Sequence, residues 1–340
     1  MIRQDGTTGG GGQPVGGDWY QRWFPLAVTF AFLGLAGFAI ANHELWRDET
    51  QAWLIARDSS SLTELFRHTR YEGHPGLWFI CLFILSRVTT SPIAMQVLHL
   101  GIGAGTVWIF ARYAPFTLWQ RALFAFGYFP LFEYTVVSRD YGLGVLLLLG
   151  ACAVLGAKPT RFPLLVTLLA LVPQTNAFAA MLGLALGLAL LVDLRLPGGP
   201  MLAVNATRRQ YVWGLVVVGV SLGLAAAQMI PPADSGIFVG WHTHLEWGLL
   251  GKRLRSLGAA VFPVPTIQNR WWISPFLWDL EPVRVPLAII VYALFTWVAI
   301  SLTRRLRALT FLVAALSAQL AFIYLKFPGE MRHWGHFFVA

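Results

Sequence analysis

Charged residues are scarce in this chain of 340 residues. Asp, Glu, Lys and Arg together make up 12% of it, whereas hydrophobic residues make up 56% and the mean hydropathy is +0.61. An ordinary soluble domain carries roughly 25% charged residues, so this composition excludes one. Since apolar runs of about 20 residues cross a bilayer as helices, we predict an all-α polytopic membrane protein.

Cysteine is nearly absent, and two other signals are missing. Cys81 and Cys152 both lie inside apolar runs, which indicates small core residues rather than a disulfide or a metal-binding pair. The N-terminal segment does not have the pattern of a cleavable signal peptide. No internal repeat is evident, which argues against a transporter built from two inverted halves.

The apolar runs follow one another along the chain at lengths close to that of a membrane span. They occupy residues 24–41, 93–110, 123–137, 143–155, 162–172, 178–192, 211–229, 285–302 and 309–325. Basic residues cluster in several of the short loops, at Lys158, Arg161, Arg195, Arg208, Arg209, Arg304, Arg305 and Arg307. The positive-inside rule assigns these loops to the cytoplasm.

This topology divides the chain into a tail and one membrane domain. We expect a flexible cytoplasmic tail at residues 1–23 and a transmembrane domain at 24–340, with extracytoplasmic loops at 42–75 and 230–284. The net charge of +9 is distributed over membrane loops. We therefore expect membrane lipids as partners, and no nucleic acid.

The region between Pro75 and Ser138 poses a conflict of parity. Both residues belong on the outer face, yet three apolar runs lie between them, at 76–85, 93–110 and 123–137. An even number of crossings is required. The first run is only about half the length of a normal span, so one of the three must be tilted, re-entrant or a partial crossing.

The first outer loop carries two neighbouring carboxylates, Asp48 and Glu49. They stand just beyond the first span, where a membrane helix meets water, so we regard them as candidate catalytic groups. An alternative is that Asp48 caps a surface helix, because Gln51 follows three residues later as in a capping box. Ser61 and Glu64 form a second such pair, which predicts amphipathic helices along the membrane surface.

Three further polar groups fall on the same side. His74 closes the first outer loop and is placed to contact an anionic headgroup. Arg139, followed closely by Tyr141, is suited to pair with a phosphate. Arg332 and His333 follow the last apolar run. The alternatives are a histidine bonded to backbone, a snorkelling arginine and plain interfacial anchors, respectively.

The second outer loop mixes aromatic rings with bases, as a lid over a sugar and phosphate would. Its notable side chains are Trp241, His242, His244, Lys252, Arg253, Arg255, Arg270, Trp271, Trp272 and Trp278. A divalent metal at His242 and His244 is a weaker alternative, since no carboxylate is adjacent to the pair in the sequence. We therefore assign no metal ligands and no certain cofactor.

Glycines recur at a small-xxx-small spacing within three of the apolar runs. The pairs are Gly101 and Gly105, Gly183 and Gly187, and Gly219 and Gly223. This spacing predicts close packing between helices of the bundle.

Four short motifs on the outer face occur in a characteristic order. They are Trp46-Arg47-Asp48-Glu49, Gly73-His74-Pro75, Ser138-Arg139-Asp140-Tyr141 and Arg332-His333. Together they resemble the GT-C superfamily of membrane glycosyltransferases, in particular its protein O-mannosyltransferase and aminoarabinose transferase-like branch. The resemblance covers most of the chain from Phe24 on.

The resemblance implies a GT-C-type helix bundle and a sugar donor linked to polyprenyl phosphate. It implies transfer to a hydroxyl of a protein, lipid or glycan on the extracytoplasmic face, and it maps the catalytic aspartate onto Asp48. A carboxylate there suits the chemistry, because it takes the proton of the attacking hydroxyl. Glu49 is expected to orient Asp48 or the acceptor. The residues expected to bind the donor phosphate or substrate are His74, Arg139, Tyr141, Arg332 and His333.

The resemblance has one departure and an alternative. Many relatives carry a second proline after the His-Pro pair, whereas Gly76 stands here, which predicts a looser helix start. Residues 337–340 read like the opening of another span, so we expect a chain truncated relative to the family. The alternative function is a lipid-sugar flippase or binding scaffold without catalysis. We expect a multi-pass protein of a bacterial inner membrane.

Overall fold

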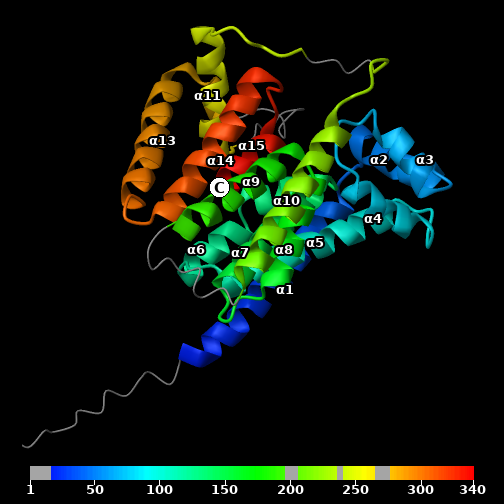
Figure 1. Ribbon diagram of the computed structural model, residues 1–340, viewed down its shortest axis with the longest axis horizontal. Helices are drawn as coiled ribbons and strands as arrows, with labels where there is room; N and C mark the ends of the chain where they lie inside the picture. Colours follow the sequence, from blue (N-terminus) through cyan, green and yellow to red (C-terminus); the bar gives the residue numbers. More distant parts are fainter. Residues whose placement is uncertain (1–16, 196–205, 236–239, 265–275) are drawn as a thin grey trace, which may run out of the picture.

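The computed structural model describes residues 17–195, 206–235, 240–264 and 276–340. All regular secondary structure in these segments is helical, which confirms the all-α prediction (Figure 1). The elements are α1 (Gly17–Ala41), α2 (Arg47–Asp58), α3 (Leu62–Thr69), α4 (Leu77–Ser86), α5 (Ile93–Tyr113), α6 (Leu118–Ala125), η1 (Phe129–Val136), α7 (Asp140–Gly156), α8 (Phe162–Leu171), η2 (Val172–Gln174), α9 (Ala177–Arg195), α10 (Arg208–Met229), α11 (Trp247–Val261), α12 (Phe276–Asp279), α13 (Glu281–Ser301), α14 (Leu306–Leu325) and α15 (Met331–Val339).

Five helices in the described parts of the chain are long and apolar enough to cross a membrane. They are Arg22–Ala41 within α1, then α5, α10, α13 and α14, each of 20 to 22 residues. At about 1.5 Å per residue such helices span roughly 30 Å, the thickness of the hydrocarbon core. Helices α4, α7, α8 and α9 are apolar but shorter. The chain therefore has the helices of a multi-pass membrane protein.

The first span begins earlier than the sequence indicated. Helix α1 starts at Gly17, within the expected tail, whereas the part of it that is suited to cross a membrane starts at Arg22. Pro25 lies inside α1 without ending it. The rest of the expected tail, residues 1–16, lies outside the described residues.

The first of the three apolar runs forms the short helix α4. It has ten residues, which is only about 15 Å, and it packs against α2 and α3 at the edge of the bundle (Figure 1). Its C-cap, Arg87, donates to the carbonyls of Ala56 and Arg57 in α2. Of the three runs, only the one that forms α5 gives a helix long enough to cross a membrane, so how the first and third runs are arranged in the membrane stays a prediction.

The third apolar run, 123–137, does not form the single helix that its hydropathy suggested. Helix α6 ends at Ala125, and η1 continues as a wide turn of π-helix. Pro130 lacks an N–H and stands in the first turn of η1, where that group is not needed. The Thr135 hydroxyl donates to the carbonyl of Pro130 at 2.7 Å, which stabilises this unusual winding.

The glycine prediction holds at two positions and is wrong at four. An added Cβ at Gly105 or Gly183 would contact a neighbouring side chain within 3.2 Å, as close helix packing requires. The others would meet nothing within 4 Å, and these are Gly101, Gly187, Gly219 and Gly223. The spacing alone therefore did not identify which helix faces are covered.

The end of the described chain folds back onto the start of the bundle. After α14 the chain turns at Gly329, whose φ of +70° suits a glycine. Helix α15 then packs against α11 and η1, with Phe337 in a core that includes Tyr134 and Tyr141. This arrangement carries the first turn of α15 to the loop that precedes α2.

Candidate functional site

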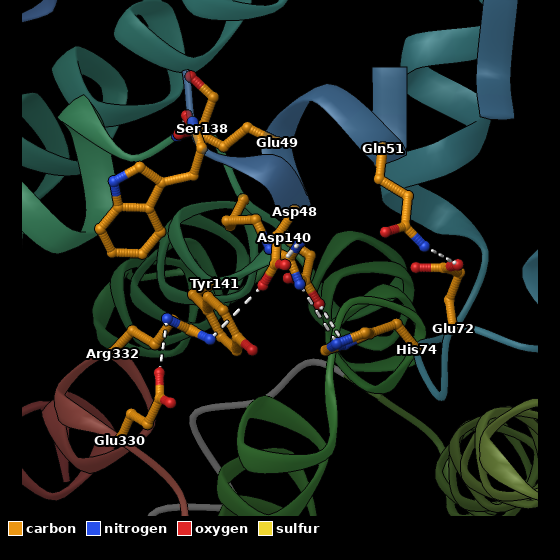
Figure 2. A network of polar contacts seen from close by, with 12 residues as sticks. Asp48, Glu49, Gln51, Glu72, His74, Ser138, Asp140, Tyr141, Glu330 and Arg332 are labelled. Carbon is orange, nitrogen blue, oxygen red and sulfur yellow. Dashed lines mark hydrogen bonds and ion pairs between the residues drawn. The ribbon is translucent and has the colours of Figure 1, made fainter. Parts of the chain in front are cut away.

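Asp48 lies at the meeting point of three distant segments. Its carboxylate Oδ2 is 3.6 Å from Nη2 of Arg332 (Figure 2). The same oxygen is 3.7 Å from Nη1 of Arg139. The Asp48 side chain is 44% exposed, whereas the two arginine side chains are 12% and 15% exposed. An accessible carboxylate thus stands between two largely buried cations, and the three residues share one face as the topology predicted.

The capping interpretation of Asp48 is wrong. Helix α2 begins at Arg47 with Trp46 as its N-cap, and Asp48 sits inside the first turn. The backbone N–H of Trp46 donates to Glu49 Oε2 at 2.9 Å, so the capping carboxylate is Glu49. Gln51 instead donates to Glu72 across the loop at 2.7 Å. Asp48 is therefore available for another role.

Glu49 is fully buried and accepts two backbone N–H groups beside the His43 ring. Its Oε1 accepts the N–H of Ser138 at 2.6 Å, and its Oε2 lies 2.9 Å from His43 as well as from the Trp46 N–H. Charge-assisted hydrogen bonds of this kind are among the stronger polar contacts in proteins. Glu49 therefore fixes α2 against the turn that holds Arg139, which makes it a positioning residue.

Arg139 is the N-cap of α7 and is held from both sides. The ring nitrogens of His99 lie 2.9 Å from the Thr135 carbonyl and 2.7 Å from the Arg139 carbonyl, which anchors the turn. Burial acts to lower the pKa of Arg139, but Tyr141, Asp140 and Asp48 raise it above its ordinary value. The guanidinium remains charged and points to Asp48.

His74 is paired with a carboxylate rather than with backbone. Its Nδ1 lies 3.0 Å from Oδ2 of Asp140, which is buried at the start of α7. Its Nε2 lies 3.5 Å from Nη2 of Arg139. The Asp140 carboxylate thus orients the His74 ring, so that its second nitrogen faces the cationic side of the site. The alternative of a backbone-bonded histidine is wrong.

Arg332 is drawn inward by its neighbours. Its Nη1 lies 2.7 Å from Oε2 of Glu330, and its guanidinium carbon lies 5.6 Å from the ring centre of Trp46. Its Nε is buried and has no hydrogen-bond partner among the described residues. These contacts do not fit a plain interfacial anchor. Glu330 was not singled out from the sequence, although it precedes Arg332 by two residues.

His333 and Tyr141 lie deeper in the bundle. The His333 Nε2 is 2.8 Å from the Tyr141 hydroxyl, and its Nδ1 accepts the N–H of Glu330. Burial lowers the pKa of His333 well below its ordinary value, with Arg332 acting in the same direction. The neutral ring therefore carries its proton on Nε2 and donates to Tyr141, so that the phenolic hydrogen is left for another acceptor. His333 therefore holds the Tyr141 side chain in place from the interior of the bundle.

Gly76 does not leave the start of α4 loose. Its N–H donates to Gln228 Oε1 at 2.9 Å, and Gln228 Nε2 donates to Gln174 Oε1 at 2.9 Å. A proline at this position would lack the donor. The start of α4 is therefore held by α10 through Gln228, in contrast to the looser start that Gly76 predicted.

Sequence reasoning missed a buried acid near the site. Glu133 in η1 is almost fully buried, with its Oε1 accepting the Tyr128 hydroxyl at 2.7 Å. Its Oε2 has no hydrogen-bond partner among the described residues. The signal was present, because an acidic residue inside an apolar run is a functional candidate by default.

The second outer loop is described only in part. Arg270, Trp271 and Trp272 lie outside the described residues. His242 lies 3.7 Å from Glu246, four residues further along the chain. The described segments contain no group of three or more side chains suited to hold a metal ion. The idea of a lid stays a prediction.

Comparison with known proteins gives no match to a family model, to a curated protein or to a solved structure. Any functional conclusion must therefore be drawn from the chemistry of the Asp48 site.

Proposed function

We propose that this chain is a membrane glycosyltransferase that transfers a sugar from a polyprenyl-phosphate donor to a hydroxyl acceptor. The observation that carries the proposal is the position of Asp48, an accessible carboxylate held between the guanidinium groups of Arg139 and Arg332. Such a site offers a carboxylate base with two cations suited to bind a phosphate less than 4 Å away. Both are needed for this reaction.

The cationic side would bind the donor phosphate. Both arginines lie more than 3.5 Å from Asp48, so their N–H groups are only loosely engaged by its carboxylate. The Nε of Arg332 is buried without a partner in the described parts of the chain. Guanidinium groups match phosphate oxygens in geometry as well as charge, so the pair can hold the leaving phosphate.

Asp48 would act on the acceptor. Its carboxylate takes the hydroxyl proton as the acceptor oxygen attacks the anomeric carbon of the sugar. A new carbon–oxygen bond forms there while the bond between that carbon and the phosphate oxygen breaks. The electron pair leaves with the lipid phosphate, whose growing charge Arg139 and Arg332 stabilise. Attack from the face opposite the phosphate inverts the anomeric configuration.

His74 and Tyr141 would complete the donor site. His74 presents its Nε2 beside Arg139, oriented by Asp140. The Tyr141 hydroxyl receives a hydrogen bond from His333 and keeps its own hydrogen for an acceptor such as a phosphate or sugar oxygen. In this assignment Glu49, Asp140 and His333 do not contact the substrate. They position the side chains that do.

The proposal also places the Asp48 site on the outer side of the membrane and the chain among GT-C-type enzymes. The basic loops at the other end of the bundle favour the cytoplasm by the positive-inside rule, which leaves the Asp48 end outside the cell. This orientation suits a GT-C-type enzyme of a bacterial inner membrane, because polyprenyl-phosphate sugars are used on the outer surface in the family that the sequence resembles.

The test is direct transfer with purified membranes. Membranes containing the chain are incubated with a panel of polyprenyl-phosphate sugars, and release of the lipid phosphate is followed together with the sugar product. We expect release with at least one donor and none with Asp48→Asn. Donor binding without release by the wild-type chain would contradict the proposal and favour the binding-scaffold alternative.

A further inference from the structure

A cavity lies at the end of the bundle away from Asp48. It has a volume of about 280 Å³ and lies among the ends of α7, α8, α9 and α10, with the start of α14 at its rim. Helix α7 connects the two ends: it begins at Asp140 beside the site and ends at Gly156, which lines the cavity. Seventeen helical residues measure roughly 25 Å, so the cavity is no part of the Asp48 site.

The cavity has an apolar interior and a cationic rim. Most of its lining is aliphatic or aromatic, including Phe162, Leu165 and Leu190. Its charged lining residues are Lys158, from the loop between α7 and α8, and Arg307, from the first turn of α14. No carboxylate lines it among the described residues. The loops at this end of the bundle carry further basic residues, namely Arg161, Arg208, Arg304 and Arg305.

An apolar interior with a cationic rim suits an anionic lipid, which has both an acyl chain and a charged headgroup. An acyl chain is compatible with the leucine-lined interior, and the adjoining phosphate would meet the lysine and arginine at the rim. Basic pockets between helices at the cytoplasmic side are suited to anionic headgroups, each cation contributing to a preference over neutral lipids. We propose that the cavity binds an anionic phospholipid, with its chain beside Leu165 and Leu190 and its phosphate against Lys158 and Arg307.

A glycine provides a way to close the cavity without disturbing the helices. Gly187 of α9 lines it, and a Cβ added there would meet nothing within 4 Å. Gly187→Leu would therefore project a side chain into the cavity from an ordinary helical position. Gly219 of α10 also faces open space but does not line the cavity, so Gly219→Leu is the matched control.

The experiment measures which lipid stays with the protein. The chain is reconstituted into vesicles of equal phosphatidylglycerol and phosphatidylcholine, extracted in mild detergent, and its retained lipids are identified by native mass spectrometry. We expect wild type to retain phosphatidylglycerol about tenfold over phosphatidylcholine. Gly187→Leu should lose the retained lipid, whereas Lys158→Gln with Arg307→Gln should retain lipid without the preference. Gly219→Leu and Arg304→Gln should behave as wild type.

Several outcomes would overturn the proposal. Equal retention of the two lipids by wild type would remove the role of the charged rim. Unchanged retention in Gly187→Leu would place the lipid elsewhere, and retention of added polyprenyl phosphate in preference to phosphatidylglycerol would assign the cavity a different occupant. Asp48→Asn should keep wild-type retention, so the result does not depend on whether the chain transfers sugar.

Discussion

Asp48 and Glu49 are adjacent in the chain but have opposite environments. Successive helical side chains point about 100° apart, so two neighbours in one turn can face different partners. Asp48 faces accessible space between two guanidinium groups, whereas Glu49 is buried and accepts two backbone N–H groups. The Asp48 carboxylate is therefore accessible from outside the protein, whereas the Glu49 carboxylate holds the start of α2 against the turn at Ser138.

Asp48→Asn should abolish transfer and leave the fold intact. The amide cannot accept the hydroxyl proton, so we expect a loss of at least about 100-fold in the rate of lipid-phosphate release. Thermal stability should change little, because Asp48 caps no helix and its ion pairs are loose. Asp58→Asn is the control, since Asp58 is an exposed carboxylate at the other end of α2. Wild-type turnover in Asp48→Asn would refute the base assignment.

Glu49→Gln should act on stability. The amide can keep one acceptor oxygen, but it replaces the other with a donor that faces an N–H group, so we expect a loss of about 1–3 kcal/mol. Thermal unfolding in detergent measures it, with the exposed Glu44→Gln as the control. A Glu49→Gln variant that is as stable as wild type but inactive would return Glu49 to a chemical role.

For single residues, the sequence predicted which of them lie on the same face of the molecule better than it predicted which atoms they contact. Loop sidedness was enough to bring Asp48, Arg139 and Arg332 to one face, because charge in the loops sets orientation. It was not enough to separate Asp48 from Glu49, since helix phase depends on the N-cap, and that cap is a tryptophan which no capping rule would select. Glu330 was missed because its contact with Arg332 depends on the turn at Gly329, which brings the two side chains together.

At the scale of elements, the start of α4 depends on a hydrogen bond that crosses the bundle. Gly76 contributes an N–H to Gln228 of α10, and a Cβ at Gly76 would also press on the Phe66 ring. The site residue His74 stands two positions earlier, so the tether steadies the end of the loop that carries it. Helix α10 thereby supports the site without contributing a residue to it.

Gly76→Pro should weaken this junction. The substitution removes the donor and crowds Phe66, and we expect about 1–3 kcal/mol of destabilisation. A double-mutant cycle with Gln228→Leu isolates the bond, because each single change removes the same contact. We expect a coupling of about 1 kcal/mol, measured by thermal unfolding. Strictly additive effects would show that the two residues do not interact.

Helix existence was easier to predict than helix continuity. The long runs became α5, α10, α13 and α14, because length and hydropathy alone decide such cases. The run 123–137 instead divides into α6 and η1, where a proline and a threonine hydroxyl reshape the backbone. Local hydrogen bonds of that kind are not visible in hydropathy, and neither is the docking of α4 on α2.

At the scale of the whole molecule, the two ends of the bundle should face different compartments. In a background without Cys81 and Cys152, we expect Asn42→Cys and Pro328→Cys to react with an impermeant thiol reagent in intact cells. Ala157→Cys and Thr303→Cys should react only after the membrane is opened. All four positions are exposed in the structure, so access to the reagent depends on the side of the membrane.

Labelling of Ala157→Cys in intact cells would reverse the orientation and place the Asp48 site in the cytoplasm. Labelling of Asn42→Cys without Pro328→Cys would instead separate the segments that carry Asp48 and Arg332. The first result would change the donor pool available to the site, and the second would contradict the shared face itself.

The Asp48 site draws on residues that a ribosome makes at very different times. At about 5–20 residues per second, on the order of 15–60 s pass between synthesis of position 48 and of position 332. During that interval Arg332 has not yet been made, so the nascent chain holds the Asp48 carboxylate without one of its two cations. The Asp48 site is therefore complete only after the last helices of this sequence have been made and have packed against the first loop.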